Sequence, residues 1–268
     1  MSALGSESGT REEHLRKTAG AVMQRLESIL AAGLDRLQVS TKEGAFDLVT
    51  DADRSTEAWL WERVHAAFPE DGFLGEEYGW RLGPTAGRDW VVDPIDGTAN
   101  FLSGIPWACS SIAVLSSGSA CSGLIVDPFR REVYLTVSAS HGSELDGKRV
   151  RVAPGEDLAG KVVLLEVPSG KPLAALAPVD QLVVSAGGTA RAMGSGALAM
   201  ALVAAGRAQA IVHAGPKIWD VAAGVALVEN AGGVVLGGDG PYVLGGDGPL
   251  VAGNASVCRV LQGALHTR

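Results

Sequence analysis

Cysteine is scarce in this 268-residue chain, and long hydrophobic runs are missing from it. The three cysteines, Cys109, Cys121 and Cys258, lie far apart and lack the Cys-x-x-Cys spacing of a zinc site, which also argues against a disulfide framework. No uninterrupted apolar run reaches the roughly 18 residues that a membrane-spanning helix needs, and the first residues lack the apolar core of a signal peptide. We therefore expect a cytoplasmic protein with reduced thiols and no membrane partner.

Charged residues are also few, at 19% of the chain, and the acidic ones outnumber the basic ones to give a formal net charge of −8. Proteins that bind nucleic acid polymers usually carry a basic patch, and the sequence has no run of Lys and Arg. We therefore expect no nucleic acid polymer as a partner. A small phosphorylated substrate is compatible with the acidic charge, because bound metal ions can reverse the local field.

Helical and extended patterns are interspersed along the whole chain. Apolar spacings of three and four residues predict helices at 11–33, 55–68, 194–205 and 221–231. Short apolar runs predict strands at 73–75, 90–92, 111–115, 121–126, 132–137, 161–166, 182–184 and 208–213. The segment 79–88 is typical of a loop, and Asp146-Gly147 of a hairpin turn between 143–145 and 148–150. Such interspersed elements indicate layered α and β structure.

A change of composition marks the middle of the chain. Residues 154–180 are rich in Pro, Gly and Ala, with a break near Pro168 to Pro178. We therefore expect two halves, an N-terminal α+β half over residues 1–155 and a C-terminal α/β half over residues 156–268. Hydrophobic residues, at 47%, are numerous enough to give such a chain a full core.

Two carboxylates follow the apolar strand predicted at 90–92. Asp93 and Asp96 lie three residues apart, with Pro94 fixing its own φ angle between them and Gly97 permitting a sharp turn after them. At the end of a strand, side chains with this spacing can converge on one point. Converging carboxylates repel one another unless a cation lies between them, and Mg²⁺ prefers such oxygen ligands.

Further acidic residues lie at the ends of other predicted elements. Glu76 and Glu77 end the short strand at 73–75, and Asp53 and Asp220 lie at the starts of helices. Each also has an ordinary structural interpretation, since an Asp before a helix is usually an N-cap and a Glu pair before a loop is usually solvated. The whole set in this order favours a metal site.

The order of these residues resembles the signature of the inositol monophosphatase family, which runs Asp…Glu-Glu…Asp-Pro-Ile/Leu-Asp-Gly/Ser-Thr…Trp-Asp-x-x-Ala. The matching residues here are Asp53, Glu76-Glu77, Asp93-Pro94-Ile95-Asp96-Gly97-Thr98 and Trp219-Asp220-Val221-Ala222-Ala223. Flanking matches are Asp47-Leu48-Val49-Thr50, Asn100-Phe101 and Gly232-Gly233. The resemblance extends over nearly the whole chain. It implies a layered α/β/α/β sandwich of the inositol monophosphatase and fructose-1,6-bisphosphatase type, assembled as a homodimer.

The resemblance also implies a site for two to three Mg²⁺ ions. By similarity, Glu76, Asp93 and the carbonyl group of Ile95 would hold the first ion. Asp93, Asp96 and Asp220 would hold the second, and Glu76 with water molecules would hold a weaker third. Paired ions of this kind can stabilise both the attacking and the leaving oxygen of a displacement at phosphorus.

The catalytic residues that the resemblance implies are Glu76, Thr98 and Asp53. Thr98 and Glu76 would activate the attacking water, and Asp53 would form a hydrogen bond with Thr98. Lys42 occupies the position of a family lysine near the active-site loop. The implied activity is that of a Mg²⁺-dependent phosphomonoesterase that acts by direct in-line attack of water, without a phosphoenzyme, and that is sensitive to millimolar lithium.

The substrate-binding residues implied in the same way are Asp96, Gly97, Thr98, Gly196, His213 and Asp220. Family members that act on inositol phosphates carry a Glu seven residues before the Trp-Asp aspartate, where this chain has His213. Three interpretations of His213 are open: a substitution at a site that no longer needs the Glu, a side chain merely exposed at a strand end, or the mark of a changed specificity. A protonated imidazole favours an anionic group, so His213 favours a substrate with a ring or a second acidic group over myo-inositol phosphate or histidinol phosphate. Gly196 would leave extra room in the pocket.

Several functions share this motif and stay open. The first is hydrolysis of a small phosphorylated polyol or sugar. The others are the phosphatases that act on histidinol phosphate, fructose 1,6-bisphosphate, 3′(2′),5′-bisphosphate nucleotides, and nucleoside or sugar phosphates of secondary metabolism. Asp-Gly-Thr-Ala-Asn-Phe is closer to the inositol and histidinol branches than to the nucleotidase branch, where Lys-Glu-Phe is usual. An inactive binding protein with the same fold is a further alternative, whereas the lack of G-x-G-x-x-G disfavours a nucleotide-binding oxidoreductase.

Overall fold

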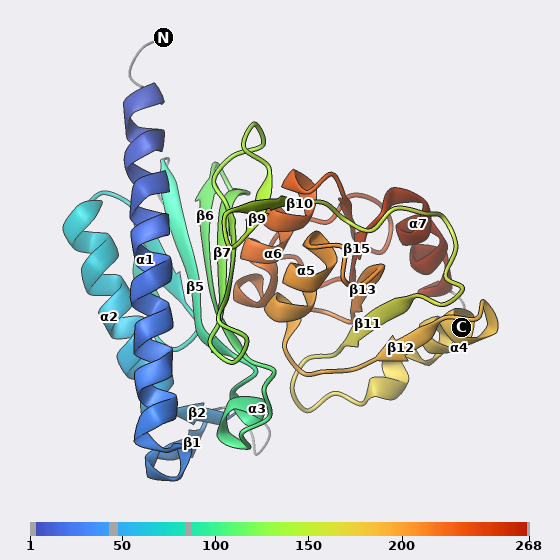
Figure 1. Cartoon of the computed structure of the whole chain (residues 1–268), viewed down its shortest axis with the longest axis horizontal. Coiled ribbons are helices and arrows are strands. Elements are labelled where there is room, and N and C mark those ends of the chain that lie inside the picture. The colour runs from blue at the N-terminus through green and yellow to red at the C-terminus, as the bar shows by residue number, and fades with distance from the viewer. Residues whose placement is uncertain (1–3, 43–47, 84–86, 267–268) are drawn as a thin grey trace.

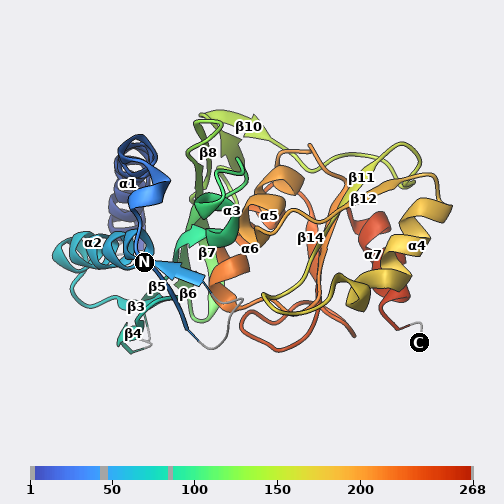
Figure 2. The same ribbon diagram turned by 90° about the horizontal axis from the view of Figure 1, so that it is seen from below.

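The chain folds into alternating helical and sheet layers, which the computed structural model describes for residues 4–42, 48–83 and 87–266. One pair of helices covers the outer face of an eight-stranded sheet, a second pair separates this sheet from a five-stranded sheet, and a third pair covers the far face of the second sheet (Figure 1). The pairs are α1 (Leu4–Ala32) with α2 (Asp51–Ala67), α5 (Gly196–Ala204) with α6 (Ile218–Asn230), and α4 (Ala177–Ser185) with α7 (Ala255–Ala264). The expected layered sandwich is confirmed, and α4 with α7 adds one more layer outside it (Figure 2).

The eight-stranded sheet has the strand order β10-β9-β8-β7-β6-β5-β3-β4. Its neighbouring strands are antiparallel except for β3 and β5, which are parallel. The strands are β3 (Gly72–Gly75), β4 (Gly79–Leu82), β5 (Arg88–Asp96), β6 (Cys109–Ser116), β7 (Ser119–Asp127), β8 (Glu132–Thr136), β9 (Ser143–Leu145) and β10 (Lys148–Val150).

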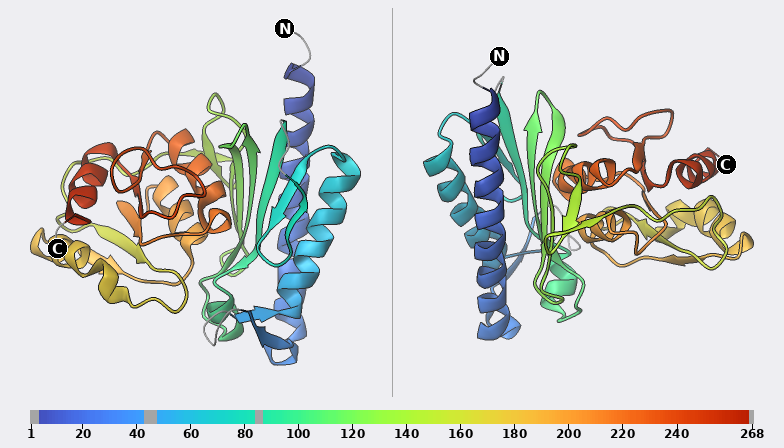
Figure 3. Two further views of the ribbon diagram at one scale, coloured as in Figure 1. Left: turned by 180° about the vertical axis from the view of Figure 1, so that it is seen from behind. Right: turned by 45° about the horizontal axis from the view of Figure 1, so that its top comes forward.

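The five-stranded sheet has the strand order β12-β11-β13-β15-β14. β11 is parallel to both of its neighbours, and the pairs that involve β15 are antiparallel. The strands are β11 (Val162–Glu166), β12 (Thr189–Arg191), β13 (Ala210–His213), β14 (Val234–Leu236) and β15 (Leu250–Gly253). A two-stranded ribbon, β1 (Val39–Thr41) with β2 (Leu48–Thr50), lies beside the short helix α3 (Thr98–Leu102), as the view from behind shows (Figure 3). Two 3₁₀ turns occupy Leu34–Arg36 and Leu173–Leu176.

Three apolar clusters fill the spaces between the layers. β5 contributes to two of them, because Trp90 and Val92 pack with α1 and α2 while Val91 packs with α5 and α6. Successive side chains of a strand point to opposite faces, so a strand that is covered on both faces is apolar throughout. This burial continues to the end of β5, where Asp93 and Asp96 are only 2% and 8% exposed.

The predicted helices and strands are mostly confirmed, with ends shifted by a few residues. The hairpin between β9 and β10 turns at Asp146 and Gly147, whose φ angles are 49° and 75°. Two consecutive positive φ angles are what a two-residue type I′ turn requires, and Asp-Gly adopts them readily. This local sequence therefore determined the turn that joins the two strands.

Two predicted elements are wrong. Part of the loop predicted at 79–88 is the strand β4, which pairs with β3 at the edge of the sheet, where polar residues are tolerated. The strand predicted at 182–184 lies inside the helix α4 instead. Pro178 fits the first turn of this helix, and Val179 and Val183, four residues apart, are both buried against the second sheet. The β-branched residues of this segment therefore pack from one face of a helix and do not form a strand.

The two expected halves correspond to the two sheets, but they share the middle helical layer. The first sheet ends at Val150 and the second begins at Val162. Residues of α5 and α6 nevertheless pack in one apolar cluster with β5, β6 and β7 of the first sheet. The division at residues 155 and 156 stays a prediction. Of the helices in the described ranges, none combines the length and the apolarity that crossing a membrane requires.

Candidate active site

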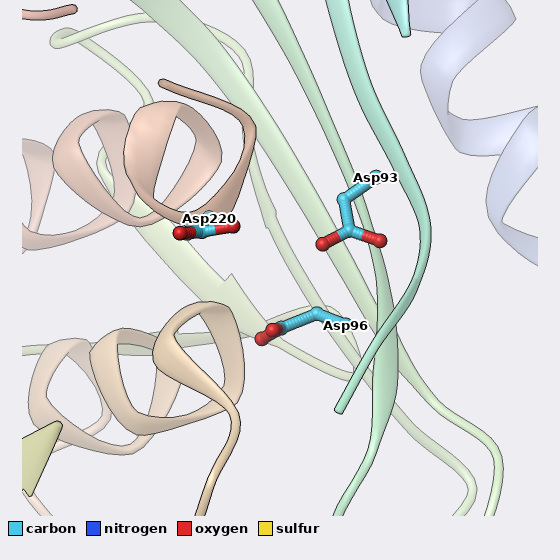
Figure 4. Close-up of side chains that lie close together, drawn as sticks. All are labelled: Asp93, Asp96 and Asp220. Atoms are coloured by element: carbon cyan, nitrogen blue, oxygen red, sulfur yellow. The ribbon is translucent and has the colours of Figure 1, made fainter. Parts of the chain in front are cut away.

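Three carboxylates from distant parts of the chain meet at one point. Asp93 and Asp96 come from the end of β5, and Asp220 comes from the first turn of α6. One oxygen of each carboxylate lies within 4.8 Å of the others. Figure 4 shows the three side chains facing a common space between β5 and the start of α6. The structure therefore brings together three of the predicted metal ligands.

Hydrogen bonds from side-chain and backbone groups fix two of these carboxylates, whereas one oxygen of the third has no partner. Asp96 Oδ2 accepts hydrogen bonds from Ser195 Oγ at 2.5 Å and from the Ala197 backbone N–H at 2.7 Å. Asp220 Oδ2 accepts one from the Lys217 backbone N–H at 2.9 Å. Asp93 Oδ1, by contrast, is buried and has no hydrogen-bond partner among the described residues. Since a buried acceptor without a partner is costly, this oxygen fits a metal ligand.

Burial and mutual repulsion make the three carboxylates hard to ionise together. Burial raises the pKa of Asp93 well above its usual value, and repulsion by Glu76, Asp96 and Asp220 raises it further. Burial also raises the pKa of Asp96 to about 6 and that of Asp220 well above its usual value. A divalent cation between them would compensate both effects, and carboxylate oxygens are the ligands that Mg²⁺ prefers. The residues present therefore fit a magnesium site.

Glu76 lies next to this group but pairs with a lysine. It follows β3, and its backbone N–H donates to the carbonyl oxygen of Val92 at 3.1 Å, which holds it beside β5. Its carboxylate accepts a hydrogen bond from Lys42 Nζ at 2.8 Å, and Glu77 accepts one from the same ammonium group at 2.7 Å. The predicted site lysine thus contacts the predicted ligand. Asp47, one of the flanking matches, lies outside the described residues.

Asp53 and Thr98 form the expected pair. Thr98 Oγ1 lies 3.0 Å from the carbonyl oxygen of Ile95, to which it donates, and 3.4 Å from Asp53 Oδ1. Asp53 also accepts from the backbone N–H of Thr50 at 2.8 Å in a capping box at the start of α2. The N-cap of α2 is Thr50, so the interpretation of Asp53 as an N-cap is wrong. Asp53 is the third residue of the helix, where Oδ2 completes the capping box and Oδ1 faces Thr98, and its catalytic role stays a prediction.

A single pocket contains every predicted site residue except Asp53. The predicted residues that line it are Glu76, Asp93, Ile95, Asp96, Gly97, Thr98, Gly196, His213 and Asp220. Sequence reasoning missed Glu166, which ends β11 and lines the same pocket. The available signal was a carboxylate at the end of the apolar strand predicted at 161–166, the same arrangement that drew attention to Asp93.

His213 is buried, so its interpretation as a side chain exposed at a strand end is wrong. It ends β13 with 4% of its surface exposed, and burial lowers the pKa of its imidazole to about 4. A ring with this pKa is neutral near pH 7, so the argument for a second acidic group on the substrate loses its basis. The expected room at Gly196 is also taken, because a Cβ atom there would lie 3.2 Å from His213 Cδ2. Gly196 therefore accommodates the imidazole ring.

The rise in melting temperature that Mg²⁺ produces is expected to grow with pH. The pKa of Asp96 in the folded, metal-free protein is about 6, above the pKa of about 3.9 for an aspartate in the unfolded chain. Between these two pH values the folded protein binds more protons than the unfolded chain, so its stability falls as the pH rises. Mg²⁺ needs the ionised form, so its stabilisation increases through the same window. Thermal unfolding with Mg²⁺ and with EDTA, from about pH 5 to about pH 8, measures the difference. An increment that does not change with pH would contradict a carboxylate site.

Comparisons with known proteins agree with this geometry. A sequence model of the inositol monophosphatase family matches residues 10–267. A Nus factor SuhB from Xylella fastidiosa is 39% identical over 214 residues, which are 78% of this chain and 76% of that protein. An inositol-1-monophosphatase from Mesorhizobium japonicum is 37% identical over 235 residues, 87% of each chain. The crystal structure of the extragenic suppressor protein suhB from Bartonella henselae superposes with a TM-score of 0.88 at 31% identity, over 95% of this chain and 98% of that one.

Proposed function

Because this chain belongs to the inositol monophosphatase family, we propose that it is a Mg²⁺-dependent phosphomonoesterase that hydrolyses a small phosphorylated polyol or sugar. The observation that carries this proposal is the meeting of Asp93, Asp96 and Asp220 in one pocket, with one oxygen of Asp93 buried and without a partner. A group of three buried carboxylates is unfavourable by itself and becomes favourable with cations.

The metal ligands would be Asp93, Asp96 and Asp220, together with Glu76 and the carbonyl group of Ile95. All five line the pocket. Two to three Mg²⁺ ions bound there would neutralise the carboxylates, polarise the phosphate group and lower the pKa of the attacking water. Glu76 would exchange its ammonium partner for this role, which its partial exposure of 21% allows.

The remaining residues would orient the phosphate group and the attacking water. Gly97 and Thr98 line the pocket directly after Asp96, where their backbone N–H groups would bind phosphate oxygens. The Thr98 hydroxyl group, held between Ile95 and Asp53, would orient the water, with Glu76 accepting its proton. The expected reaction is in-line attack by water, with no phosphoenzyme.

The names of the relatives raise a second possibility, that the chain acts as a binding protein in a larger assembly. The name Nus factor belongs to the Xylella fastidiosa relative and the name inositol-1-monophosphatase to the Mesorhizobium japonicum one. The net charge of −8 disfavours direct binding of nucleic acid, and the retained carboxylates and Thr98 favour an enzyme. The homodimer and the cytoplasmic location stay predictions, and sedimentation of the purified protein measures the first.

Phosphate release is expected with Mg²⁺ and is expected to stop in EDTA. The panel contains myo-inositol 1-phosphate, histidinol phosphate, fructose 1,6-bisphosphate, 3′,5′-bisphosphoadenosine, nucleoside monophosphates and sugar phosphates. The first compound and the simple sugar phosphates are expected to react faster than the bisphosphates, because no Lys or Arg lies among the described lining residues to pair with a second phosphate group. Millimolar lithium in the same assay tests the inhibition that the family resemblance implies. Release that persists in EDTA, or its absence with every compound, would contradict the proposal.

A further inference from the structure

Glu57 is a buried carboxylate of α2 that holds the turn after β3. It is fully buried, and its two oxygens accept hydrogen bonds from the backbone N–H groups of Glu77 at 2.7 Å and Tyr78 at 3.2 Å. These two residues lie between β3 and β4 and directly follow Glu76, a proposed metal ligand. A Cβ atom on Gly75 would overlap the Glu57 carboxylate. The carboxylate is therefore packed against the end of β3, where the chain leads into Glu76.

Glu166 holds a second segment in the same way. It ends β11 with 3% of its surface exposed, and its two oxygens accept hydrogen bonds from the backbone N–H groups of Met193 at 3.1 Å and Gly194 at 3.0 Å. The residues that follow, 195–197, donate two hydrogen bonds to Asp96 Oδ2, at 2.5 Å and 2.7 Å. Glu166 therefore fixes the backbone that in turn binds a second proposed metal ligand.

The two held segments lie on different sides of the metal site. Residues 76–78 form a turn and residues 192–195 form a loop, so no helix or sheet ladder supplies acceptors for their N–H groups. Each glutamate supplies them instead, one from α2 in the outer helical layer and the other from β11 in the second sheet (Figure 1). Metal ligands must be held within about 0.5 Å of the productive geometry. The positions of Glu76 and Asp96 therefore depend on how these two segments are fixed.

We propose that Glu57 and Glu166 are positioning residues of the metal site, in which Glu57 fixes Glu76 and Glu166 fixes Asp96 through the backbone that each of them holds. This inference rests on the proposed Mg²⁺ site and phosphatase function. Neither glutamate has to contact the metal or the substrate for this role. The loss of either one therefore weakens Mg²⁺ binding without changing how the metal-loaded protein binds its substrate.

Glu57→Gln and Glu166→Gln each replace one carboxylate oxygen with an NH₂ group. An amide nitrogen donates and cannot accept from a backbone N–H, so one of the two hydrogen bonds becomes a contact between two donors and the segment moves. Loss of a residue that orients metal ligands lowers metal affinity by about 10- to 100-fold, so we expect the Mg²⁺ dissociation constant of each variant to rise by about tenfold or more. The KM for myo-inositol 1-phosphate at saturating Mg²⁺ is expected to stay unchanged.

Asp127→Asn is the matched control for a purely structural role. Asp127 is fully buried, and its Oδ1 accepts hydrogen bonds from the backbone N–H groups of Phe129 at 2.9 Å and Arg130 at 3.1 Å. It lies outside the pocket lining, and the turn that it holds contains no proposed metal ligand. This variant makes the same change from carboxylate to amide. It is expected to lower the melting temperature and to keep the wild-type Mg²⁺ dissociation constant.

Ser195→Ala tests the route from Glu166 to Asp96. It removes one of the hydrogen bonds to the Asp96 carboxylate. If Glu166 acts through this segment, the two changes are not independent, and the double variant should raise the Mg²⁺ dissociation constant by less than the product of the two single factors. A double variant that reaches the full product would overturn the route. Ser195→Ala also shows how Mg²⁺ binding depends on the position of Asp96 if Glu166→Gln fails to fold.

Mg²⁺ binding is measured by calorimetry on the substrate-free proteins, and phosphate release at increasing Mg²⁺ concentrations gives the activity. Wild-type Mg²⁺ dissociation constants in both glutamine variants would overturn the proposal, even if their melting temperatures fell. A raised KM of Glu166→Gln with unchanged Mg²⁺ binding would overturn its positioning role, because it would indicate direct contact with the substrate. A wild-type protein that binds Mg²⁺ but releases no phosphate from any compound would overturn the proposed function alone, since the binding measurements would still decide the positioning. A wild-type protein that binds no Mg²⁺ would overturn both.

Discussion

Asp93→Asn is expected to abolish Mg²⁺-dependent phosphate release and, at the same time, to raise the melting temperature of the metal-free protein. Asparagine has the size of aspartate but lacks its charge. The change removes a metal ligand. Loss of a residue that only contacts a metal ligand already lowers metal affinity or activity by about 10- to 100-fold, so we expect the activity of Asp93→Asn to fall by at least about 100-fold. It also removes a buried charge that Asp96 and Asp220 repel. Removal of this repulsion stabilises the metal-free protein at a pH at which the wild-type carboxylates would be ionised together.

The two effects are measured on the same preparations. Phosphate release gives the activity, and thermal unfolding in EDTA and in Mg²⁺ gives the stability of each form. The rise in melting temperature caused by Mg²⁺ should shrink in Asp93→Asn. Asp239→Asn is the control, because its side chain is 98% exposed and lies in a surface turn. An Asp93→Asn protein that is less stable than the wild type in EDTA would contradict the repulsion argument, even if the activity were lost.

Gly97→Ala is expected to reduce both stability and activity. Gly97 has a φ angle of +86°, and a Cβ atom there would lie 3.0 Å from the carbonyl oxygen of Trp107 and 3.1 Å from that of Gly194. A non-glycine residue in this conformation costs about 1–2 kcal/mol, and the contacts with backbone atoms add to it. Relief of the contacts would move the loop that carries Asp96. We therefore expect a fall of tenfold or more in kcat/KM, since displacements of about 1 Å cost up to about 100-fold.

Gly79→Ala separates the two contributions. Gly79 has a φ angle of +66°, and no atom lies within 4 Å of the position of its Cβ atom. It therefore carries the conformational cost without the contacts. Denaturant unfolding of both variants gives the difference in free energy, which is assigned to the contacts with Trp107 and Gly194. Equal losses of stability in the two variants would show that the motif loop tolerates a side chain.

The sequence indicated Asp93 and Asp96 as candidate metal ligands because their signal is local. Asp93 and Asp96 follow an apolar strand that is buried on both faces, and this strand forms as the pattern predicts. The turn at Asp146 was equally local. Each of these features depends on residues within a few positions of one another, where propensity and periodicity are informative.

The features that were missed depend on the pairing of distant residues. The pairing of β11 with β13 places Glu166 beside His213, and the backbone N–H groups of residues 193–194 donate hydrogen bonds to its carboxylate. A single sequence displays neither contact. The true role of Gly196, to accommodate the His213 ring, has the same origin. The error at Val183 arose because packing of a helix against a sheet selects β-branched residues as readily as a strand does.

The middle helical layer has a consequence for motion. α5 and α6 are buried between the two sheets, and one apolar cluster joins them to strands of both. A hinge movement that opened the molecule between its sheets would expose this cluster to water at about 25 cal/mol for each Å². Domains that close around a substrate are usually joined by smaller and more polar interfaces. Substrate and product should therefore exchange through the mouth of a pocket that exists before binding, while the two sheets keep a fixed spacing throughout the catalytic cycle.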